Sequence, residues 1–556
     1  MRKILLIVLC CTAALLAGYA GYRSYKVWKQ EHFMRLAREF LAKPDVRNAA
    51  LCLNKVLRSN PQHLDAMRLM ANLTEAGRSP STLLWRARVV ELNPHSVEDR
   101  LALARTAVMF RDISLATNTL EGVGQADRQT AAYQNLAGTV AAAANDFDSA
   151  KSHFREAIRI EPHNLASQLN LAVIQVHETN ASAIAGALNT LQSISKNPTN
   201  SSLRCQALRE LILNAAHNKQ TNAEVALCRQ LLLETNSVFN DRLVQVEVLH
   251  QTRNPEFLSS LNALQQEAAS DPQKLQELAT WEMTKISPAE TIKWLKKLPP
   301  NTLTNQPAAT LVAECGMMIG DWRGLQSFLE PQKWAELEFL RHAFKSRALR
   351  EQGLTDAAKT EWEQALKSAN GQKQSFVMLL RLAAQWHWVS EGEDLLWTIV
   401  SRYPQEKWAT QALTQTLFAG GQTRSLMQLF KQELKGTPSD LAARNNLAMI
   451  AMLLDVKELK PHDLAREVYQ QAPTNSSFAA TYAFSLYLQG KSAEALKVMQ
   501  QLKPKDLENP SIAGYYGLIL KATGSGAKAR VYLNWTSKAT LLPEERKLFD
   551  QANAGS

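Results

Sequence analysis

Two hydrophobic patterns divide the sequence. An apolar run without a charged residue extends from Ile4 to Tyr22, and amphipathic segments follow from Glu31 onward. These segments have the period of an α-helix, and short breakers containing Pro, Gly, Asn or Asp separate them. The pattern predicts an all-α protein of about fifteen helix–turn–helix pairs.

Prolines recur along the chain at nearly one spacing. Pro61 and Pro94 are 33 residues apart, and Pro404, Pro438 and Pro473 are separated by 34 and 35. A period near 34 is the length of one helix pair in a stacked array. We therefore expect a right-handed α-solenoid, preceded by an N-terminal transmembrane helix, whose pairs bury their cores against one another and leave a long groove.

The same spacing suggests four segments along the chain. Between Pro255 and Pro331 the prolines become irregular, and the helices over Ile292–Leu298 and Trp322–Leu329 are expected to be short. A boundary is placed at the Pro299-Pro300-Asn301 turn, because paired prolines interrupt a helix. The predicted segments are an N-terminal anchor or signal peptide (1–30), an N-terminal array (31–300), a C-terminal array (301–541), and a polar capping helix with a tail (542–556).

The apolar run at the N-terminus has the length of a membrane span. Its 19 residues would rise about 28 Å as a helix, close to the roughly 30 Å of a bilayer core. Tyr25 and Trp28, with basic neighbours, follow the run, as in an interfacial belt. The alternative is a cleaved signal peptide, for which Gly18 and Ala20 provide small residues near a cleavage site.

Small and aromatic residues recur at fixed steps within the predicted pairs. Ala150, Phe154 and Ala157 stand at relative positions 0, +4 and +7, and Ala358, Trp362 and Ala365 repeat these steps, as do positions beginning at Ala49 and around Ala495. Small residues let two helices approach, and an aromatic ring fills the adjacent gap. The pattern resembles that of the tetratricopeptide repeat family over roughly residues 31–541.

This resemblance implies that the first helix of each pair lines a concave groove. In the family, an Asn before the motif Leu often hydrogen-bonds the backbone of an extended peptide. Asn135, Asn170 and Asn446 occupy this position here, and they are candidate peptide-groove residues. The alternative is a surface Asn that bonds only to water.

Tryptophan is concentrated in one part of the chain. Nine of the twelve tryptophans lie between Trp281 and Trp408, where they could form a stacking surface or fill the core. Trp386, Trp388 and Trp408 are the candidates for an exposed aromatic surface. Adjacent residues of one helix cannot all face the core, so the segment Trp386-His387-Trp388 is set apart from the core-filling tryptophans.

A basic series follows one predicted helix, with Arg341, His342, Lys345, Arg347 and Arg350 on it. It could contact an anionic partner, or it could be a solvated face. The formal net charge is +11, but the first thirty residues carry five basic and no acidic side chains. The remainder is mildly basic, and no nucleic-acid partner is expected.

The sequence carries no motif of an enzyme. HExxH, GxSxG, the P-loop pattern and GxGxxG after a strand are all missing. The six cysteines form no CxxC pair, and most are expected to be core thiols. We therefore expect no catalytic residues, no cofactor and no metal.

These patterns lead to a prediction of function. The leading hypothesis is a single-pass protein of the bacterial inner membrane. Its groove is expected to bind partner proteins or peptides, so that the protein acts as a scaffold in the assembly of a bacterial envelope complex. The solenoid is favoured on the exported, periplasmic side. The alternative is an accessory protein of polysaccharide export or secretion, whose groove and tryptophans guide a polymer.

Overall fold

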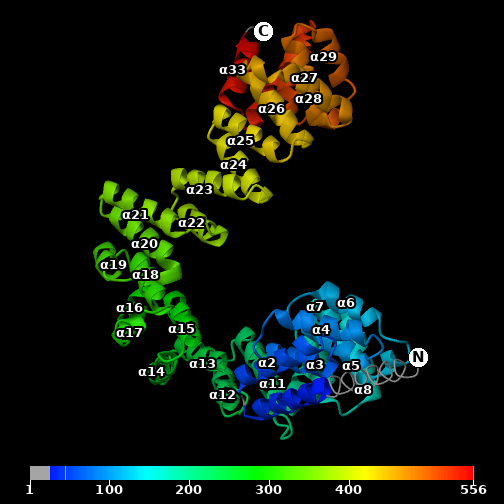
Figure 1. Cartoon of the computed structure of the whole chain (residues 1–556), viewed down its shortest axis with the longest axis vertical. Helices are drawn as coiled ribbons and strands as arrows, with labels where there is room; N and C mark the ends of the chain where they lie inside the picture. Colours follow the sequence, from blue (N-terminus) through cyan, green and yellow to red (C-terminus); the bar gives the residue numbers. More distant parts are fainter. Residues whose placement is uncertain (1–24, 44, 555–556) are drawn as a thin grey trace, which may run out of the picture. The chain divides into compact units, whose positions relative to one another are not determined.

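The computed structural model describes residues 25–43 and 45–554, and these residues form helices and turns without a strand. Contacts divide the chain into two units, Met1–Leu278 and Ala279–Ser556. Within each unit, successive helices are neighbours that pack in pairs (Figure 1). None of the helices in the described ranges is long and apolar enough to cross a bilayer. The predicted span Ile4–Tyr22 lies outside the described residues.

We call the first helix of each pair the A helix and the second the B helix. Residues 25–42 are helical and form the first A helix. The following A helices of unit 1 are α3 (Leu64–Ala76), α5 (Val97–Met109), α7 (Ala131–Ala143), α9 (Leu165–Gln175), α11 (Ser201–His217) and α13 (Phe239–Gln251). Its B helices are α2 (Val46–Ser59), α4 (Ser81–Leu92), α6 (Ile113–Glu121), α8 (Phe147–Ile160), α10 (Ala181–Ser195), α12 (Thr221–Leu232) and α14 (Phe257–Ala268), and a 3₁₀ turn, η1, covers Asp127–Gln129.

The division between the units falls within the A helix α15 (Pro272–Lys285). The A helices that follow are α18 (Ala308–Ile319), α20 (Glu338–Glu351), α22 (Lys373–Gln385), α24 (Lys407–Ala419), α26 (Leu441–Leu453), α28 (Ser476–Leu488) and α31 (Pro510–Ala522). The B helices are α16 (Pro288–Leu295), α19 (Trp322–Leu329), α21 (Thr355–Ser368), α23 (Val389–Arg402), α25 (Thr423–Gly436), α27 (Pro461–Gln471), α29 (Ser492–Met499) and α32 (Gly526–Trp535). The remaining elements are α17 (Pro300–Leu303), α30 (Pro504–Leu507), α33 (Pro543–Ala554), η2 (Ala335–Leu337), η3 (Lys457–Leu459) and η4 (Thr536–Lys538).

The described residues thus contain fifteen helix pairs, followed by α33. The predicted all-α architecture of repeated helix pairs is confirmed, and the handedness of the array stays a prediction. The B helices α16 and α19 have eight residues each, and α19 has the predicted bounds. The contact division lies earlier in the chain than the Pro299-Pro300-Asn301 turn, where the sequence places the boundary.

Close approach of A and B helices explains the repeated small residues. The repeat-packing positions are all buried, and they are Ala49, Ala150, Phe154, Ala157, Ala358, Trp362, Ala365 and Ala495. A Cβ added at Gly138 on α7 would come within 2.6 Å of the Phe154 ring on α8. Only a residue without a side chain lets the two helices meet at this distance.

The turn between the A and B helices has one recurring conformation. It contains a residue with positive φ in most pairs, namely Arg78, Arg111, Asn145, Lys219, Arg253, Gly320, Gly353, His387, Gly421, Asp455, Gly490 and Gly524. In several turns the next residue is an Asp whose carboxylate accepts a bond from the start of the B helix, as Asp146 does from Ser149 N at 3.1 Å. The left-handed residue reverses the chain, and the Asp caps the helix that follows.

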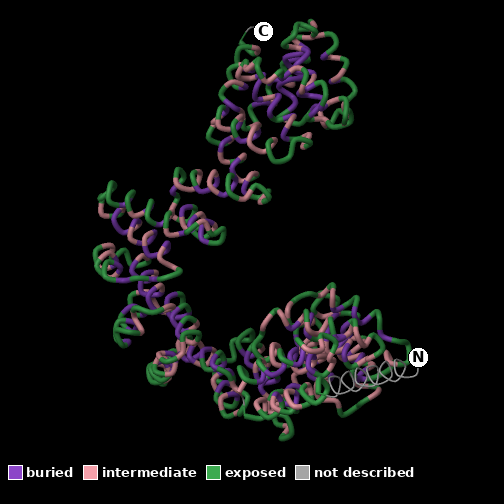
Figure 2. The backbone as a smooth tube through the Cα atoms, viewed as in Figure 1, coloured by how far each residue is buried: buried purple, intermediate pink, exposed green. Residues whose placement is uncertain are grey.

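The last helix differs from the predicted polar cap. The A helix α31 is buried from Ile512 to Leu520 without interruption, and α33 packs against it. The Phe549 ring of α33 lies where a Cβ on Gly514 would come within 2.6 Å of it. Buried residues gather in the middle of these C-terminal helices (Figure 2). The C-terminal helix therefore supplies core as well as a polar outer face.

Candidate functional site

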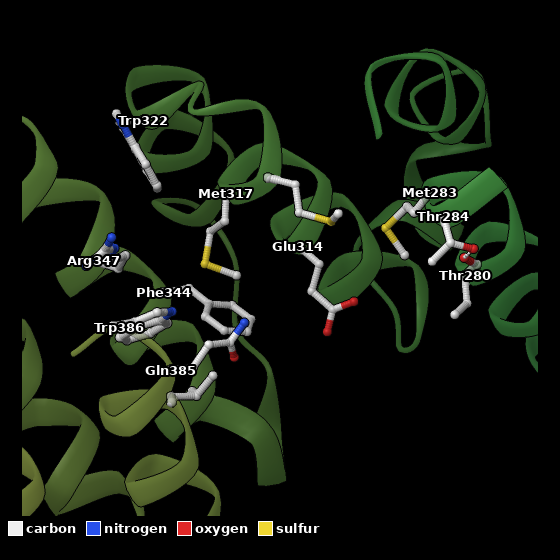
Figure 3. Close-up of a pocket in the computed structure, with 12 residues that line it drawn as sticks. Thr280, Met283, Thr284, Glu314, Met317, Trp322, Phe344, Arg347, Gln385 and Trp386 are labelled. Atoms are coloured by element: carbon white, nitrogen blue, oxygen red, sulfur yellow. Dashed lines mark hydrogen bonds between the residues drawn. The ribbon is translucent and has the colours of Figure 1, made fainter. Parts of the chain in front are cut away.

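A pocket of about 400 Å³ lies on the A helices α15, α18, α20 and α22 (Figure 3). Its lining is mainly apolar and comprises Met283, Met317, Met318, Trp322, Phe344, Leu382 and Trp386, with Thr280, Thr284, Glu314, Arg347 and Gln385 as the polar members. Met318 is 61% exposed at the pocket. Aromatic and methionine side chains around a few polar groups are typical of sites that bind flexible ligands.

Aromatic rings surround the one cationic side chain of the pocket. The Arg347 guanidinium carbon lies 5.8 Å from the ring centroids of both Trp322 and Trp386. Arg347 also forms an ion pair with Glu351, with Nη2 and Oε1 2.8 Å apart. The positive charge is thus neutralised on its own helix, and the stacked rings fix the guanidinium at one end of the pocket.

Glu314 is the one acidic residue in the pocket lining. Its carboxylate projects from α18 into the space between Phe344 and Gln385 on one side and Met283 on the other (Figure 3). Burial raises the pKa of this carboxyl group. Within the described residues, Glu314 has no hydrogen-bond partner and no ion-pair partner for its side chain. A carboxylate in apolar surroundings without a cation is a group that a ligand could satisfy.

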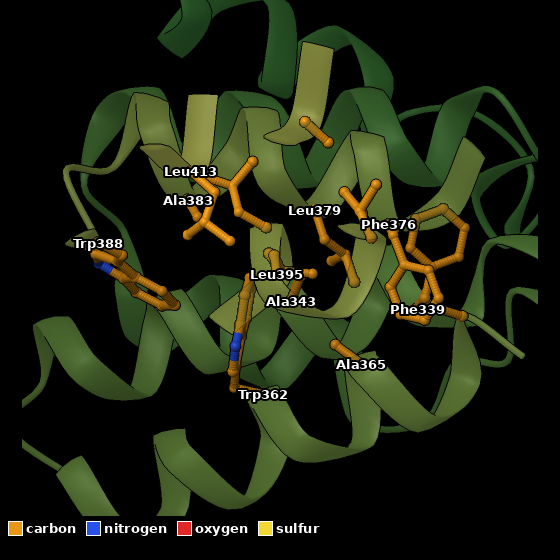
Figure 4. Close-up of a cluster of buried hydrophobic side chains, with 14 of the residues drawn as sticks. Phe339, Ala343, Trp362, Ala365, Phe376, Leu379, Ala383, Trp388, Leu395 and Leu413 are labelled. Atoms are coloured by element: carbon orange, nitrogen blue, oxygen red, sulfur yellow. The ribbon is translucent and has the colours of Figure 1, made fainter. Parts of the chain in front are cut away.

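The prediction for Trp388 as an exposed residue is wrong, because Trp388 is 5% exposed and belongs to a core that extends from α18 to α26 (Figure 4). Trp386 and Trp388 are not neighbours on one helix, since α22 ends at Gln385 and α23 begins at Val389. His387 between them has a positive φ of 58°. This turn brings both rings inward, with their centroids 4.9 Å apart, and Trp388 packs edge-on against Trp362 at 5.3 Å.

Trp408 does not extend the pocket. Its side chain is 41% exposed near the start of α24, and its Nε1 donates a hydrogen bond to Glu406 at 2.8 Å. Among the described ring contacts, Trp386 and Trp388 are paired with each other and Trp408 with neither. The three candidate tryptophans therefore form no single aromatic surface, and only Trp386 lines the pocket.

The basic series on α20 is not a free cationic face. Each member has a carboxylate partner: Arg341 with Glu338, His342 with Glu338 and Glu361, Lys345 with Glu330 and Glu361, Arg347 with Glu351, and Arg350 with Glu391. Burial opposes ionisation of Glu361, but hydrogen bonds from His342 and Lys345 outweigh it and lower the pKa. These pairs join α20 to α21 and α23, which is a structural role.

The structure brings Asn135 and Asn170 together. Asn170 Nδ2 donates a hydrogen bond to Asn135 Oδ1 at 3.1 Å, and Ser167 Oγ donates to the same oxygen at 3.2 Å. The side-chain amides of α7 and α9 thus contact each other within the protein. Asn446 is exposed on α26 and lies in another part of the array. Peptide binding by these three residues stays a prediction.

Similar polar links join other A helices of unit 1. Arg68 Nη2 of α3 lies 2.6 Å from Asp99 Oδ2 of α5, and Arg209 Nε of α11 lies 2.7 Å from Asp241 Oδ1 of α13. Both aspartates are buried. A buried carboxylate is stable only with such a partner, so these residues hold consecutive repeats together.

The described cysteines are free and buried, at Cys52, Cys205, Cys228 and Cys315. Burial raises the pKa of Cys228 and of Cys315 to about 12, so both remain protonated thiols near neutral pH. In the part of the chain that the structure describes, no group of His, Cys, Asp and Glu could hold a metal ion. Cys10 and Cys11 lie outside that part.

The sequence pattern indicates Trp386 and Arg347 as candidates, but it does not indicate Glu314 or the methionines of the pocket. Glu314 and Met318 lie on α18, whereas Met283 lies on α15. The one feature of the sequence that could have indicated Glu314 is its position as an isolated acidic residue, between Ala313 and Cys315, in an otherwise apolar helix. Its partners come from different repeats, and their meeting depends on how the A helices stack.

Comparisons with known proteins give only distant likenesses. No family model matches the chain, and no curated protein matches it. A solved structure of PilF from Pseudomonas aeruginosa is 14% identical over 40% of this chain and 99% of its own, with a TM-score of 0.30. Naa15/Naa10 bound to HypK-THB matches at 10% identity over 94% and 96% of the two chains, with a TM-score of 0.30. The APC/C hetero-tetramer Cut9–Hcn1 matches at 13% over 89% and 96%, with a TM-score of 0.25.

Likenesses this low carry nothing about the function of this chain. The repeats themselves identify its architecture. Their A helices start at intervals near 34 residues from α3 to α9 and again from α22 to α31, and small residues with one aromatic ring occupy the A–B contacts. The described chain is an array of tetratricopeptide-like helix pairs.

Proposed function

We propose that this protein is a membrane-tethered scaffold that binds segments of partner proteins in the pocket on α15, α18, α20 and α22. The observation that supports this function is an open, mainly apolar pocket on consecutive A helices. Exposed apolar surface of this kind is costly unless it serves recognition. In the C-terminal helices the A helix α31 is buried by its neighbours, among them α33.

The pocket suits a peptide because it combines adaptable and fixed contacts. Methionines from α15 and α18 can adjust to different apolar side chains. Gln385 offers an amide at the edge of the pocket, and Arg347 is held by Glu351 and two tryptophans. Such a combination of contacts suits a site that binds and orients a chain.

A site-specific photocrosslinker tests this binding role. Replacing Met318 by a photoreactive phenylalanine analogue in the native host should give a discrete crosslinked protein, since Met318 is exposed at the pocket. The same analogue at Leu354, which is exposed in the turn between α20 and α21, is the control. Equal crosslinking patterns at both positions, or none at Met318, would reject the proposed function.

The tether is the second part of the proposal. The predicted span Ile4–Tyr22 supports an anchor in a bacterial inner membrane, with the array on the exported side and a role in envelope assembly. Protease added to intact spheroplasts should digest a full-length, C-terminally tagged chain. Protection of the full-length chain would place the array in the cytoplasm, and a shortened chain would indicate cleavage of the N-terminal segment.

A polymer-guiding role gains no support from the tryptophans. The hypothesis requires Trp386, Trp388 and Trp408 to line one face, whereas Trp388 is buried and Trp408 lies apart from the pocket. We therefore propose protein segments as the ligands.

A further inference from the structure

The charge balance of the pocket defines the chemistry of its ligand. The charged side chains in its lining are Glu314 and Arg347. Arg347 is already neutralised by Glu351 at 2.8 Å and covered by Trp322 and Trp386. Glu314 has no such partner within the described residues, so the pocket has one uncompensated negative charge when Glu314 is ionised.

The surroundings of Glu314 make this charge costly in the free protein. Phe344, Met283 and Met317 line the same space, and burial alone accounts for the raised pKa of Glu314, with no cation near enough to lower it. A cationic group placed beside the carboxylate would favour its ionised form and donate the hydrogen bonds of an ion pair to it. An anionic group would instead add repulsion in a site of low polarity.

We propose that the pocket recognises a protein segment in which a lysine or arginine is flanked by apolar residues, with its cationic group bound to Glu314. The methionine and aromatic side chains then contact the apolar neighbours and the aliphatic stem of the cationic side chain. This inference rests on the proposed function and specifies the partner of the same site. It also assigns Glu314 as the residue that determines specificity.

The test uses a random dodecapeptide library displayed on phage and selected on the purified full-length chain. We expect the selected peptides to be enriched in lysine or arginine next to apolar residues. The strongest binder is then synthesised with a fluorescent label, together with a version in which glutamine replaces its cationic residue. Affinities are measured by fluorescence anisotropy.

Two isosteric variants separate the contribution of Glu314 from a general change of charge. Glu314→Gln removes the pocket carboxylate, and Glu363→Gln removes an exposed carboxylate on the outer helix α21. Loss of one charged hydrogen bond should weaken binding of the cationic peptide by about tenfold or more. We expect this loss for Glu314→Gln alone, and we expect the glutamine peptide to bind the wild type and Glu314→Gln equally.

The outcomes distinguish this inference from the proposed function. Selected peptides that bind the pocket without cationic enrichment, or that bind Glu314→Gln as tightly as the wild type, overturn the assignment of a cationic ligand alone. Met318→Arg, which places a bulky cation at the exposed edge of the pocket, tests the site itself. Failure to select any peptide, or binding that Met318→Arg leaves unchanged, overturns both proposals.

Discussion

Two regions of unit 2 are built from the same kind of helix pair but differ in how much of the A-helix surface is buried. On α15, α18, α20 and α22 the A helices leave an open pocket with an unpaired carboxylate at Glu314. Helix α31 is instead buried from Ile512 to Leu520, because α28, α29, α30, α32 and α33 all pack on it. An A helix can therefore either leave part of its surface open or be buried as core.

The composition of the A helices explains the difference. Helix α20 alternates apolar residues with Arg341, His342, Lys345, Arg347 and Arg350, each paired with a carboxylate. Helix α31 has no charge between Pro510 and Leu520. A helix that is apolar on all sides must be covered on all sides, and α28, α29, α32 and α33 together cover α31.

Removing the Phe549 ring should have the largest effect on the stability of the buried C-terminal region. Phe549→Ala deletes a buried aromatic side chain and should lower the free energy of unfolding of the C-terminal helices by about 3–5 kcal/mol. Hydrogen exchange of α31 and α33 measures the loss. Lys547→Ala, at an exposed position on the same helix, is the control. Unchanged protection of α31 in Phe549→Ala would mean that α33 is not part of its core.

Filling the space at Gly514 should have the next largest effect. A Cβ at this position would lie 2.6 Å from the Phe549 ring and 2.8 Å from Thr536, so Gly514→Ala should destabilise these helices by about 1–3 kcal/mol. Thermal unfolding monitored by circular dichroism gives the effect. Combining it with Phe549→Ala should cost less than the sum of the two changes, because they share one contact. Strict additivity would contradict the close contact.

The buried carboxyl group of Glu545 should make the covered region sensitive to pH. Burial raises its pKa above the ordinary 4.5, although Leu542 N donates to it at 2.9 Å and the Tyr515 hydroxyl also donates to it. The folded state favours the protonated form of Glu545. The stability that this form contributes is complete below pH 4.5, and it is lost as the pH rises through the raised pKa of the folded state. Hydrogen exchange of α33 between pH 4 and 8 should show this loss.

Glu545→Gln provides the comparison for this pH effect. The glutamine side chain cannot ionise. As the pH rises, α33 should therefore lose protection in the wild type but keep it in the variant. Parallel pH profiles of the two proteins would show that Glu545 does not titrate in this range.

Gly392→Ala should have the smallest effect, and in the opposite direction. Gly392 lies in α23, and a Cβ there would meet only Leu380 at 4.0 Å. Alanine is favoured over glycine in a helix by roughly 0.5–1 kcal/mol, so the melting temperature should rise slightly. A fall would indicate that the region of the open pocket is packed as tightly as the region around Gly514.

The repeat and its packing positions could be predicted from the sequence, whereas the course of the turns could not. Spacing alone predicts the packing contacts of Ala150, Phe154 and Ala157, because each helix buries the same face in every pair. The left-handed residues include Arg78 and Lys219, whose residue types have no preference for this conformation. Stacking of the flanking helices imposes their conformation, and the turn at His387 is why Trp386 and Trp388 both point inward.

The sequence by itself determined the helix pairs, their period and the small residues that bring A and B helices together, because these are properties of one repeat. Only the tertiary structure decided which A-helix surfaces stay open. Glu314 and Arg347 lie on two different helices and Trp386 lies in the turn after α22, and α33 packs on α31 by contacts between residues such as Gly514 and Phe549. Contacts of this kind join residues of different repeats. They depend on how the repeats stack, which the spacing within one repeat does not determine.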